Sequence, residues 1–367
     1  MTNASVNGTG SATVSQRSFA VSAGRVAVAH SFTNGRATSV GGTASFAGDG
    51  SATAQNGSLS ATANSGVTGA VGGSGSGKVA ARSHEVSVAI DTPSGVKSFT
   101  NSNGGVKGST TGGDTATGSF QAGGTATAAN GSGLGSTAQS SVFGGLTGDG
   151  NGAARGHAAS YSAADMTSQG LQSASLSVGR VSATQNAFGS YDASGASSGN
   201  GYATTPIGAG PGSVASRSGV DGSVDGAGIA ASFSSNRSAA GVGTVNGTTT
   251  VFGASVSRGE LAAGGSGAAG FGSSGRAGVS LADATGAPVA SIGVNSSARG
   301  SLPGVSGAPF DAIGAGGASA TGNSNTGSVS TGANVNESAF GHPALSNPAV
   351  TVAGARGVGS AGVAVTP

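Results

Sequence analysis

The chain has 367 residues, of which 74 are glycine and none is cysteine or tryptophan. Fifteen Lys and Arg residues against thirteen Asp and Glu residues leave a formal net charge of +2. The absence of cysteine excludes a disulfide framework. The low charge excludes a disordered chain kept open by charge repulsion. No apolar run is long enough for a membrane-spanning helix.

Large apolar side chains are scarce, because Val, Leu, Ile and Phe together account for 60 of the 367 residues. Ordering each residue costs roughly 1–2 kcal/mol, and glycine is among the most expensive to order. An ordinary core of large side chains cannot offset this cost here. Nearly complete backbone hydrogen bonding and close packing of small side chains are therefore required, and repetitive stacking of short strands provides both.

The first part of the chain alternates between apolar and small polar side chains. Residues 1–13 are small and polar, and we expect them to fray. The alternation sharpens from Val14 and is punctuated by glycine, which is typical of short strands. Residues 43–58 then read TASFAGDGSATAQNGS, a phrase built around Phe46 that ends at Asn56 and Gly57.

A second copy of this phrase is the strongest internal repeat. Residues 117–132 read TGSFQAGGTATAANGS and match the first copy at ten of sixteen positions, at an offset of 74. Phe120 is the counterpart of Phe46, and Asn130 with Gly131 is the counterpart of the first Asn-Gly pair. Asn-Gly suits type I′ turns between strands. We apply the same turn interpretation to Asn7–Gly8, Asn34–Gly35 and Asn246–Gly247.

Proline divides the chain into two regions. Pro93 is the one proline before residue 205, and eight follow it. Proline is confined to turns, edges and strand starts. The sequence therefore predicts a Pro-poor, repeat-bearing β region over 1–205 and a Pro-containing β region over 206–367, either separate from the first or continuous with it as one elongated domain.

Three short motifs resemble functional sites but lack the context that those sites need. Residues 72–78 (GGSGSGK) resemble a phosphate-binding loop, yet Val79 stands where a Ser or Thr must reach Mg²⁺. Residues 195–199 spell a nucleophile elbow, but nothing in the sequence places a histidine beside it. The Gly-Asp-Gly turns lack the spacing of a calcium loop. We predict no enzyme activity and no catalytic, cofactor or metal site.

The predicted fold is all-β. The first choice is a β-solenoid or a related stacked-rung architecture of short strands and Gly or Asn-Gly turns, with roughly 18–25 residues per rung. The alternative is a β-sandwich with long ordered loops. In either fold, Phe46 and Phe120 are expected to occupy equivalent positions.

The predicted function follows from the uncapped ends of such a stack, which invite strand addition. We expect a self-assembling structural subunit of an extracellular fibre or biofilm and surface matrix, amyloid-like in its function, located outside the cell or at its surface. Its partner is another copy of itself, with surface glycans as a further partner. The alternative is a β-rod adhesin or phage-fibre-like module that recognises a surface glycan. The basic residues are scattered singly, so no nucleic-acid partner is predicted.

Overall fold

The computed structural model confirms the all-β class. It describes residues 1–167, 170–186, 189–204, 209–245, 248–282, 288–302, 311–322, 329–343 and 350–365, and every regular element within them is a strand. The strands are β1 (Thr2–Ala23), β2 (Val26–Asn56), β3 (Leu59–Thr92), β4 (Gly95–Thr111), β5 (Thr115–Ala129), β6 (Gly135–Asp149), β7 (Gly152–Thr167), β8 (Gly170–Gln185), β9 (Ser190–Thr204), β10 (Ala209–Val245), β11 (Thr248–Ala282), β12 (Pro288–Leu302), β13 (Asp311–Gly322), β14 (Val329–Pro343) and β15 (Val350–Val365).

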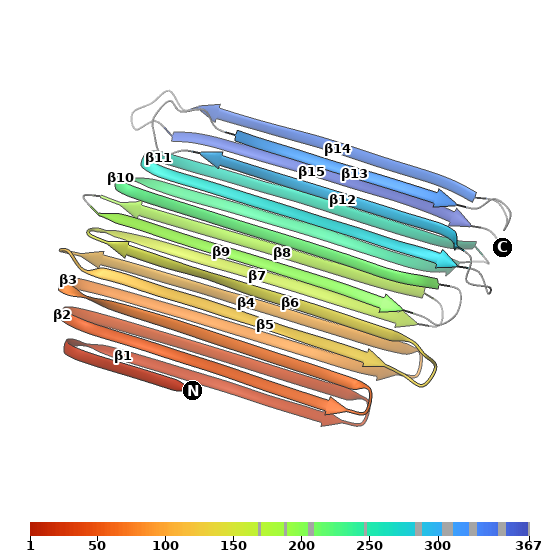
Figure 1. Ribbon diagram of the computed structural model, residues 1–367, viewed down its shortest axis with the longest axis horizontal. Helices are drawn as coiled ribbons and strands as arrows, with labels where there is room; N and C mark the ends of the chain where they lie inside the picture. Colours follow the sequence, from red (N-terminus) through yellow and green to blue (C-terminus); the bar gives the residue numbers. More distant parts are fainter. Residues whose placement is uncertain are drawn as a thin grey trace.

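The strands form two face-to-face layers that extend from β1 at one end to β13 and β14 at the other (Figure 1). All pairings between the described strands are antiparallel. Layer 1 consists, in spatial order, of residues 9–23, 26–40, 76–92, β4, β7, β8, 228–243, 248–264, β15 and β14. Layer 2 consists of residues 2–8, 42–56, 59–73, β5, β6, β9, 209–225, 265–282, β12 and β13.

The repeating unit is a U-shaped arch, with one segment in each layer joined by a bend. β2 is one arch: residues 26–40 pair with β3 in layer 1, and residues 42–56 pair with β3 in layer 2. Elsewhere two strands make up the arch, as β4 does with β5, β6 with β7 and β8 with β9. Hairpin turns join successive arches at the ends away from the bends, so neighbouring arches run in opposite directions. Because β3 and β10 pair in both layers, hydrogen bonding forms a closed ring through β3, β4, β7, β8, β10, β9, β6 and β5.

A glycine with positive φ stands at each bend, where the chain leaves one layer for the other. A side chain is strained in that backbone conformation, so glycine is the residue that fits there. From Gly112 to Gly150, Gly189, Gly226 and Gly265 the intervals are 38, 39, 37 and 39 residues. The two sequence phrases lie after the bends at Gly41 and Gly112, which are two arches apart, so their offset of 74 residues returns the chain to the same layer in the same direction.

The β-solenoid interpretation is not confirmed, because a coil that advances in one direction would place neighbouring strands parallel. Stacked rungs remain, but each is longer than predicted: β3 alone spans 34 residues and β10 spans 37. The sandwich alternative shares the two layers, yet the turn between β2 and β3 has only two residues. β9 pairs with β10 across the boundary at residue 205, and the division into two regions stays a prediction.

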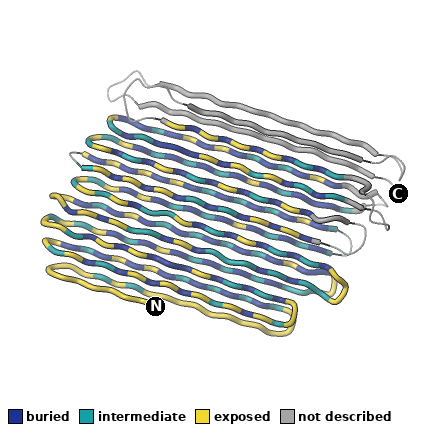
Figure 2. Tube along the Cα trace, viewed as in Figure 1, coloured by how far each residue is buried: buried dark blue, intermediate teal, exposed yellow. Residues whose placement is uncertain are grey.

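Inward and outward residues alternate along the strands, as the striped colouring of Figure 2 shows. The interior holds two apolar bands that run across the strands. The band beside the bends includes Phe46, Phe120 and Tyr191, and the band beside the hairpin turns includes Leu59 and Met166. Most members of both bands are Ala and Val, as the shortage of large side chains requires.

The few large interior side chains lie against glycines of the opposite layer. The ring of Phe120 in layer 2 occupies the place that a Cβ of Gly104, in layer 1, would take. The ring of Phe46 does the same at Gly35. The turn interpretation of Asn34–Gly35 is therefore wrong, since this pair lies inside β2 and its glycine leaves room for an aromatic ring.

Candidate functional site

A stripe of buried hydroxyl groups separates the two apolar bands. Its members lie near the middle of each strand and hydrogen bond between the layers. The Oγ–Oγ distances are 2.7 Å for Ser31–Ser65, 2.7 Å for Ser102–Ser140, 2.6 Å for Ser175–Ser216 and 2.7 Å for Ser255–Ser296. A shift of the strands would leave these hydroxyls buried without partners, which costs more than moving one small apolar side chain past another. We infer that this serine stripe fixes the register between the layers.

Glu85 is the one acidic side chain in the serine stripe that the structure describes as fully buried. Ser87 Oγ donates a hydrogen bond of 3.0 Å to its Oε1, and Ser102 Oγ donates to its Oε2. Burial raises the pKa of Glu85 to about 8, and the serine hydrogen bonds oppose this rise. The carboxyl group is therefore mostly protonated at neutral pH, and it acts as a structural hydrogen-bonding group.

Both predicted phenylalanines are buried in layer 2, where Phe46 is 3% exposed and Phe120 is 2% exposed. They belong to the apolar band beside the bends, on β2 and β5, which run in the same direction with β3 between them. The expected equivalence of the two residues agrees with this placement. Their role is to fill the thin interior, and neither reaches a surface where a ligand could bind.

The two predicted Asn-Gly turns differ from each other. Asn56 is still paired with Leu59, so Gly57, with a φ of 59°, and Ser58 form the turn. Asn56 Nδ2 instead donates to the carbonyl oxygen of Gly24, at 2.6 Å, and ties one hairpin turn to the next.

The second turn is longer. Asn130 Oδ1 accepts hydrogen bonds from the backbone N–H groups of Ser132 (3.0 Å) and Leu134 (3.1 Å). The positive φ falls at Gly133, at 77°, rather than at Gly131. Of the other pairs, Asn7–Gly8 lies at the register shift within β1, and Asn246–Gly247 lies outside the described residues.

β1 forms an open edge of the stack in both layers. Within the described chain it pairs only with β2, and most of its side chains are exposed (Figure 2). Arg17 is the single charged side chain among its 22 residues. At the other end, β13 and β14 each pair with one strand in the described part of the chain. A long edge with so little charge is a template for the addition of another strand.

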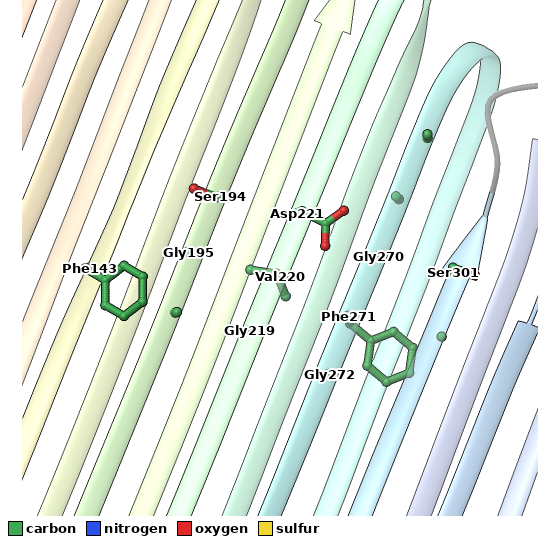
Figure 3. Close-up of a pocket in the computed structure, with 14 residues that line it drawn as sticks. Phe143, Ser194, Gly195, Gly219, Val220, Asp221, Gly270, Phe271, Gly272 and Ser301 are labelled. Atoms are coloured by element: carbon green, nitrogen blue, oxygen red, sulfur yellow. The ribbon is translucent and has the colours of Figure 1, made fainter.

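The outer face of layer 2 carries shallow troughs around one aromatic side chain. Phe143 on β6 is 62% exposed and borders three of them, with volumes of ≈ 770, ≈ 820 and ≈ 810 Å³. In the trough of Figure 3, Ser194 on β9, Asp221 on β10 and Ser301 on β12 lie around a floor of small residues. Burial raises the pKa of Asp221. The second trough is lined by uncharged amides and hydroxyls, among them Asn64, Gln121, Gln139, Ser198 and Asn200.

The outer face of layer 1 is different in character. Apolar and aromatic side chains dominate its half nearer the hairpin turns, and cations dominate its half nearer the bends. The apolar half includes Phe19, Val28, Val88, Phe99, Tyr161 and Leu176. Phe99 and Tyr161 pack with ring centroids 5.6 Å apart.

A pair of histidines also lies on this face. The Nε2 atoms of His30 and His84 are 2.9 Å apart, and Phe19 stacks on the ring of His30. One ring donates to the other, which requires the accepting ring to be neutral. Burial lowers the pKa of each, and in His84 the neighbouring His30 lowers it further. No group of three or more His, Cys, Asp or Glu side chains in the described ranges is arranged to hold a metal ion.

The motifs that resembled catalytic sites have no catalytic geometry. Ser197, the expected nucleophile of residues 195–199, lies buried within β9, where its Oγ donates to the carbonyl oxygen of Val178 at 3.2 Å. Residues 72–78 form the bend of β3 and the start of its second arm. The absence of enzyme activity itself stays a prediction.

No protein-family model matches the sequence, and searches of curated proteins and of solved structures found no similar chain. The residues described here include no helix with the length and hydrophobicity of a membrane span. The argument for function therefore depends on the open edge and on the two outer faces.

Proposed function

We propose that the protein is a self-assembling structural subunit of an extracellular fibre or surface matrix, and that it polymerises through its open β edges. The observation that carries this proposal is β1, an exposed edge strand of 22 residues with a single charge. Natural proteins usually protect such edges with charges, prolines or covering loops. In this chain, the residues of β1 supply almost none of that protection.

The two ends of the stack are matched in length in layer 1. In layer 1, the second arm of β1 spans residues 9–23, and β14 at the far end has the same length of 15 residues. Pairing of β1 in one copy with β14 in the next would extend layer 1 without interruption. Strand addition of this kind gains its affinity from backbone hydrogen bonds.

The interior supports a mechanical role. Hydrogen-bonded ladders run through every described strand, and the serine stripe joins the layers along the stack. A filament of such units would bury its backbone amides and leave few sites for proteolysis. The resistance of the material would come from hydrogen bonding and close packing of small residues.

The experiment is to compare Ser15→Pro with Gln16→Pro in β1. Neighbouring residues of a strand direct their N–H groups to opposite sides, so one proline removes a bond to β2 and the other removes a donor from the open edge. The variant that loses a donor on the open edge should keep the circular dichroism spectrum of the native protein and should form no filaments in negative-stain electron microscopy. The other variant should lower thermal stability.

Ser141→Lys, on the outer face of the central strand β6, is the matched control and should leave filaments unchanged. Wild-type protein that remains as discrete rods at high concentration would contradict the proposal. Filaments that persist in both proline variants would show that β1 is not the growing edge.

A glycan-binding rod is the second candidate function, and the troughs around Phe143 favour it. An exposed ring flanked by uncharged amides suits the apolar face and the hydroxyl groups of a neutral sugar. Phe143→Ala should then abolish retention on a neutral glycan that the wild-type protein binds. Equal retention of both proteins would remove this candidate.

A further inference from the structure

The structure gathers six cations of the scattered sequence onto one surface. They lie on the outer face of layer 1, on the half nearer the bends, and occupy five adjacent strands from β2 to β8. With strands about 4.8 Å apart, this basic patch is about 19 Å wide. Its members are Arg36, Lys78, Arg82, Lys107, Arg155 and Arg180.

The charges of the basic patch are not neutralised by other described side chains. The three ion pairs in this part of the chain join Arg25 to Asp91, Lys97 to Asp165 and Arg258 to Glu260, all outside the patch. Lys107 on β4 stands directly opposite Arg155 on β7. Like charges in that position destabilise a sheet, so the fold itself gives no reason for this pair.

The pKa of a histidine inside the patch is affected by the same positive charges. His157 lies opposite Arg180 on the neighbouring strand. Its pKa is lowered first by burial and then by the charges of Arg82 and Arg180. The guanidinium of Arg180 lies over the ring of Phe233, 5.1 Å from its centroid, which orients that cation on the surface.

We propose that the basic patch binds an acidic polysaccharide, a chain of sugars that carry carboxylate groups. Arginine pairs with planar carboxylates through two parallel hydrogen bonds. A polyuronate presents one carboxylate on each sugar ring, a repeat comparable with the ~4.8 Å strand separation. Cations on adjacent strands can therefore engage successive sugars of one chain lying across the strands.

The surroundings of the patch favour this occupant over three others. A second copy docked face to face would bring like charges together. The outward residues between the cations are small, such as Ala80, Gly105 and Ser182, so the patch itself offers no apolar side chain for insertion into a lipid surface. The apolar half of this face lies beyond the patch, toward the hairpin turns. Two aromatic rings lie beside the patch, and each already has a partner: Phe233 is covered by Arg180, and Phe32 packs edge-on against His84 with ring centroids 6.3 Å apart. Stacking of nucleic-acid bases uses free aromatic faces.

The inference does not depend on polymerisation, because every residue of the patch belongs to one chain. The experiment measures fluorescence anisotropy of labelled polygalacturonate with wild-type protein, with the double variant Lys107→Ser/Arg155→Ser and with Arg217→Ser/Arg276→Ser. The second pair removes the same charge from the exposed outer face of layer 2. The patch variant should bind about tenfold more weakly or worse, and the layer-2 variant should bind nearly as the wild type does.

Three results would overturn the proposal. Equal losses in the two double variants would show a response to net charge alone, and no loss in either would remove the site. Tighter binding of single-stranded DNA, or of vesicles with anionic lipids, than of polygalacturonate would assign the patch to that partner. A neutral dextran of the same length should not bind, and added salt should weaken binding of the polyuronate. Circular dichroism establishes that both variants are folded.

Discussion

The two outer faces share one backbone architecture and differ almost completely in chemistry. Layer 1 presents apolar rows, aromatic contacts and the basic patch. Layer 2 presents mainly Thr, Ser, Asn and Gln with small floors, the exposed rings of Phe143 and Tyr202, and scattered charges such as Arg217 and Asp221. Both faces cover the same interior of Ala, Val, Gly and Ser. The comparison shows that the arch repeat determines which residues point outward, while the chemical character of those outward residues can differ between the two faces.

The comparison depends on the two layers staying together, so one of the two changes with a large expected effect on stability separates them. Gly104→Val in layer 1 would place a side chain in the space of the Phe120 ring. We expect a loss of about 3 kcal/mol in the free energy of unfolding, since overpacking typically costs 1–3 kcal/mol and the whole neighbouring band is rigid. Urea denaturation measures this loss.

Gly219→Val is the control for that substitution. Gly219 lies on the outer face of layer 2, where an added Cβ meets nothing within 4 Å. Its effect on stability should be small. The double variant Gly104→Val/Phe120→Ala should regain part of the lost stability, and an effect at Gly104 no larger than at Gly219 would contradict the packing argument.

Glu85 gives the other large effect on stability, because it belongs to the interior that both faces share. Its pKa in the folded protein, about 8, lies above its ordinary value of 4.5. The folded state therefore binds more protons than the unfolded state between these pH values, and stability falls as pH rises from about 4.5 to about 8. This one group should cost on the order of 3–5 kcal/mol by pH 9.

Glu85→Gln should remove that dependence, because an amide can replace the protonated carboxyl group in the serine stripe. Urea midpoints at pH 5 and pH 9 measure the difference between the two proteins. Glu260→Gln is the matched control, since that residue is exposed beside Arg258. Identical pH profiles of wild type and Glu85→Gln would show that Glu85 is not buried as described.

The smallest expected effect on stability comes from a substitution in the basic patch, which tests the difference in charge between the two faces. Lys107→Glu turns the like-charge pair with Arg155 into an opposite pair, which should raise stability by about 0.2–1 kcal/mol at low salt. At 1 M salt the gain should disappear, because screening acts over about 3 Å there. Thermal denaturation at the two salt concentrations measures this, and a gain that persists at high salt would exclude an electrostatic cause.

The sequence predicted the all-β class because alternation and glycine punctuation are local signals. It also drew attention to Phe46 and Phe120, which both lie buried in layer 2, and their equivalence stays a prediction. It could not predict the arch itself: the bend glycines are indistinguishable by composition from the many others, such as Gly35, that lie within strands. Pairing of β2 with β3 in both layers is a long-range property that no short motif records.

The chemistry of the outer faces could not be predicted from the sequence either. The basic patch contains residues from Arg36 to Arg180, and their spacing in sequence looks random because arches alternate in direction. Only the register places Lys107 opposite Arg155. Lys78 was noted in the sequence as the end of a phosphate-loop motif, and its position on the outer face of layer 1 follows from the bend of β3.

The stacking of arches also determines how the molecule would behave under tension. Each arch is bonded to its neighbours and to nothing further along the stack. A pull between distant points would detach the outermost arch first and leave the remainder intact. An arch of about 38 residues releases about 130 Å of chain when extended. A molecule pulled in this way would therefore lengthen in steps, one arch at a time, and dissipate work at each step.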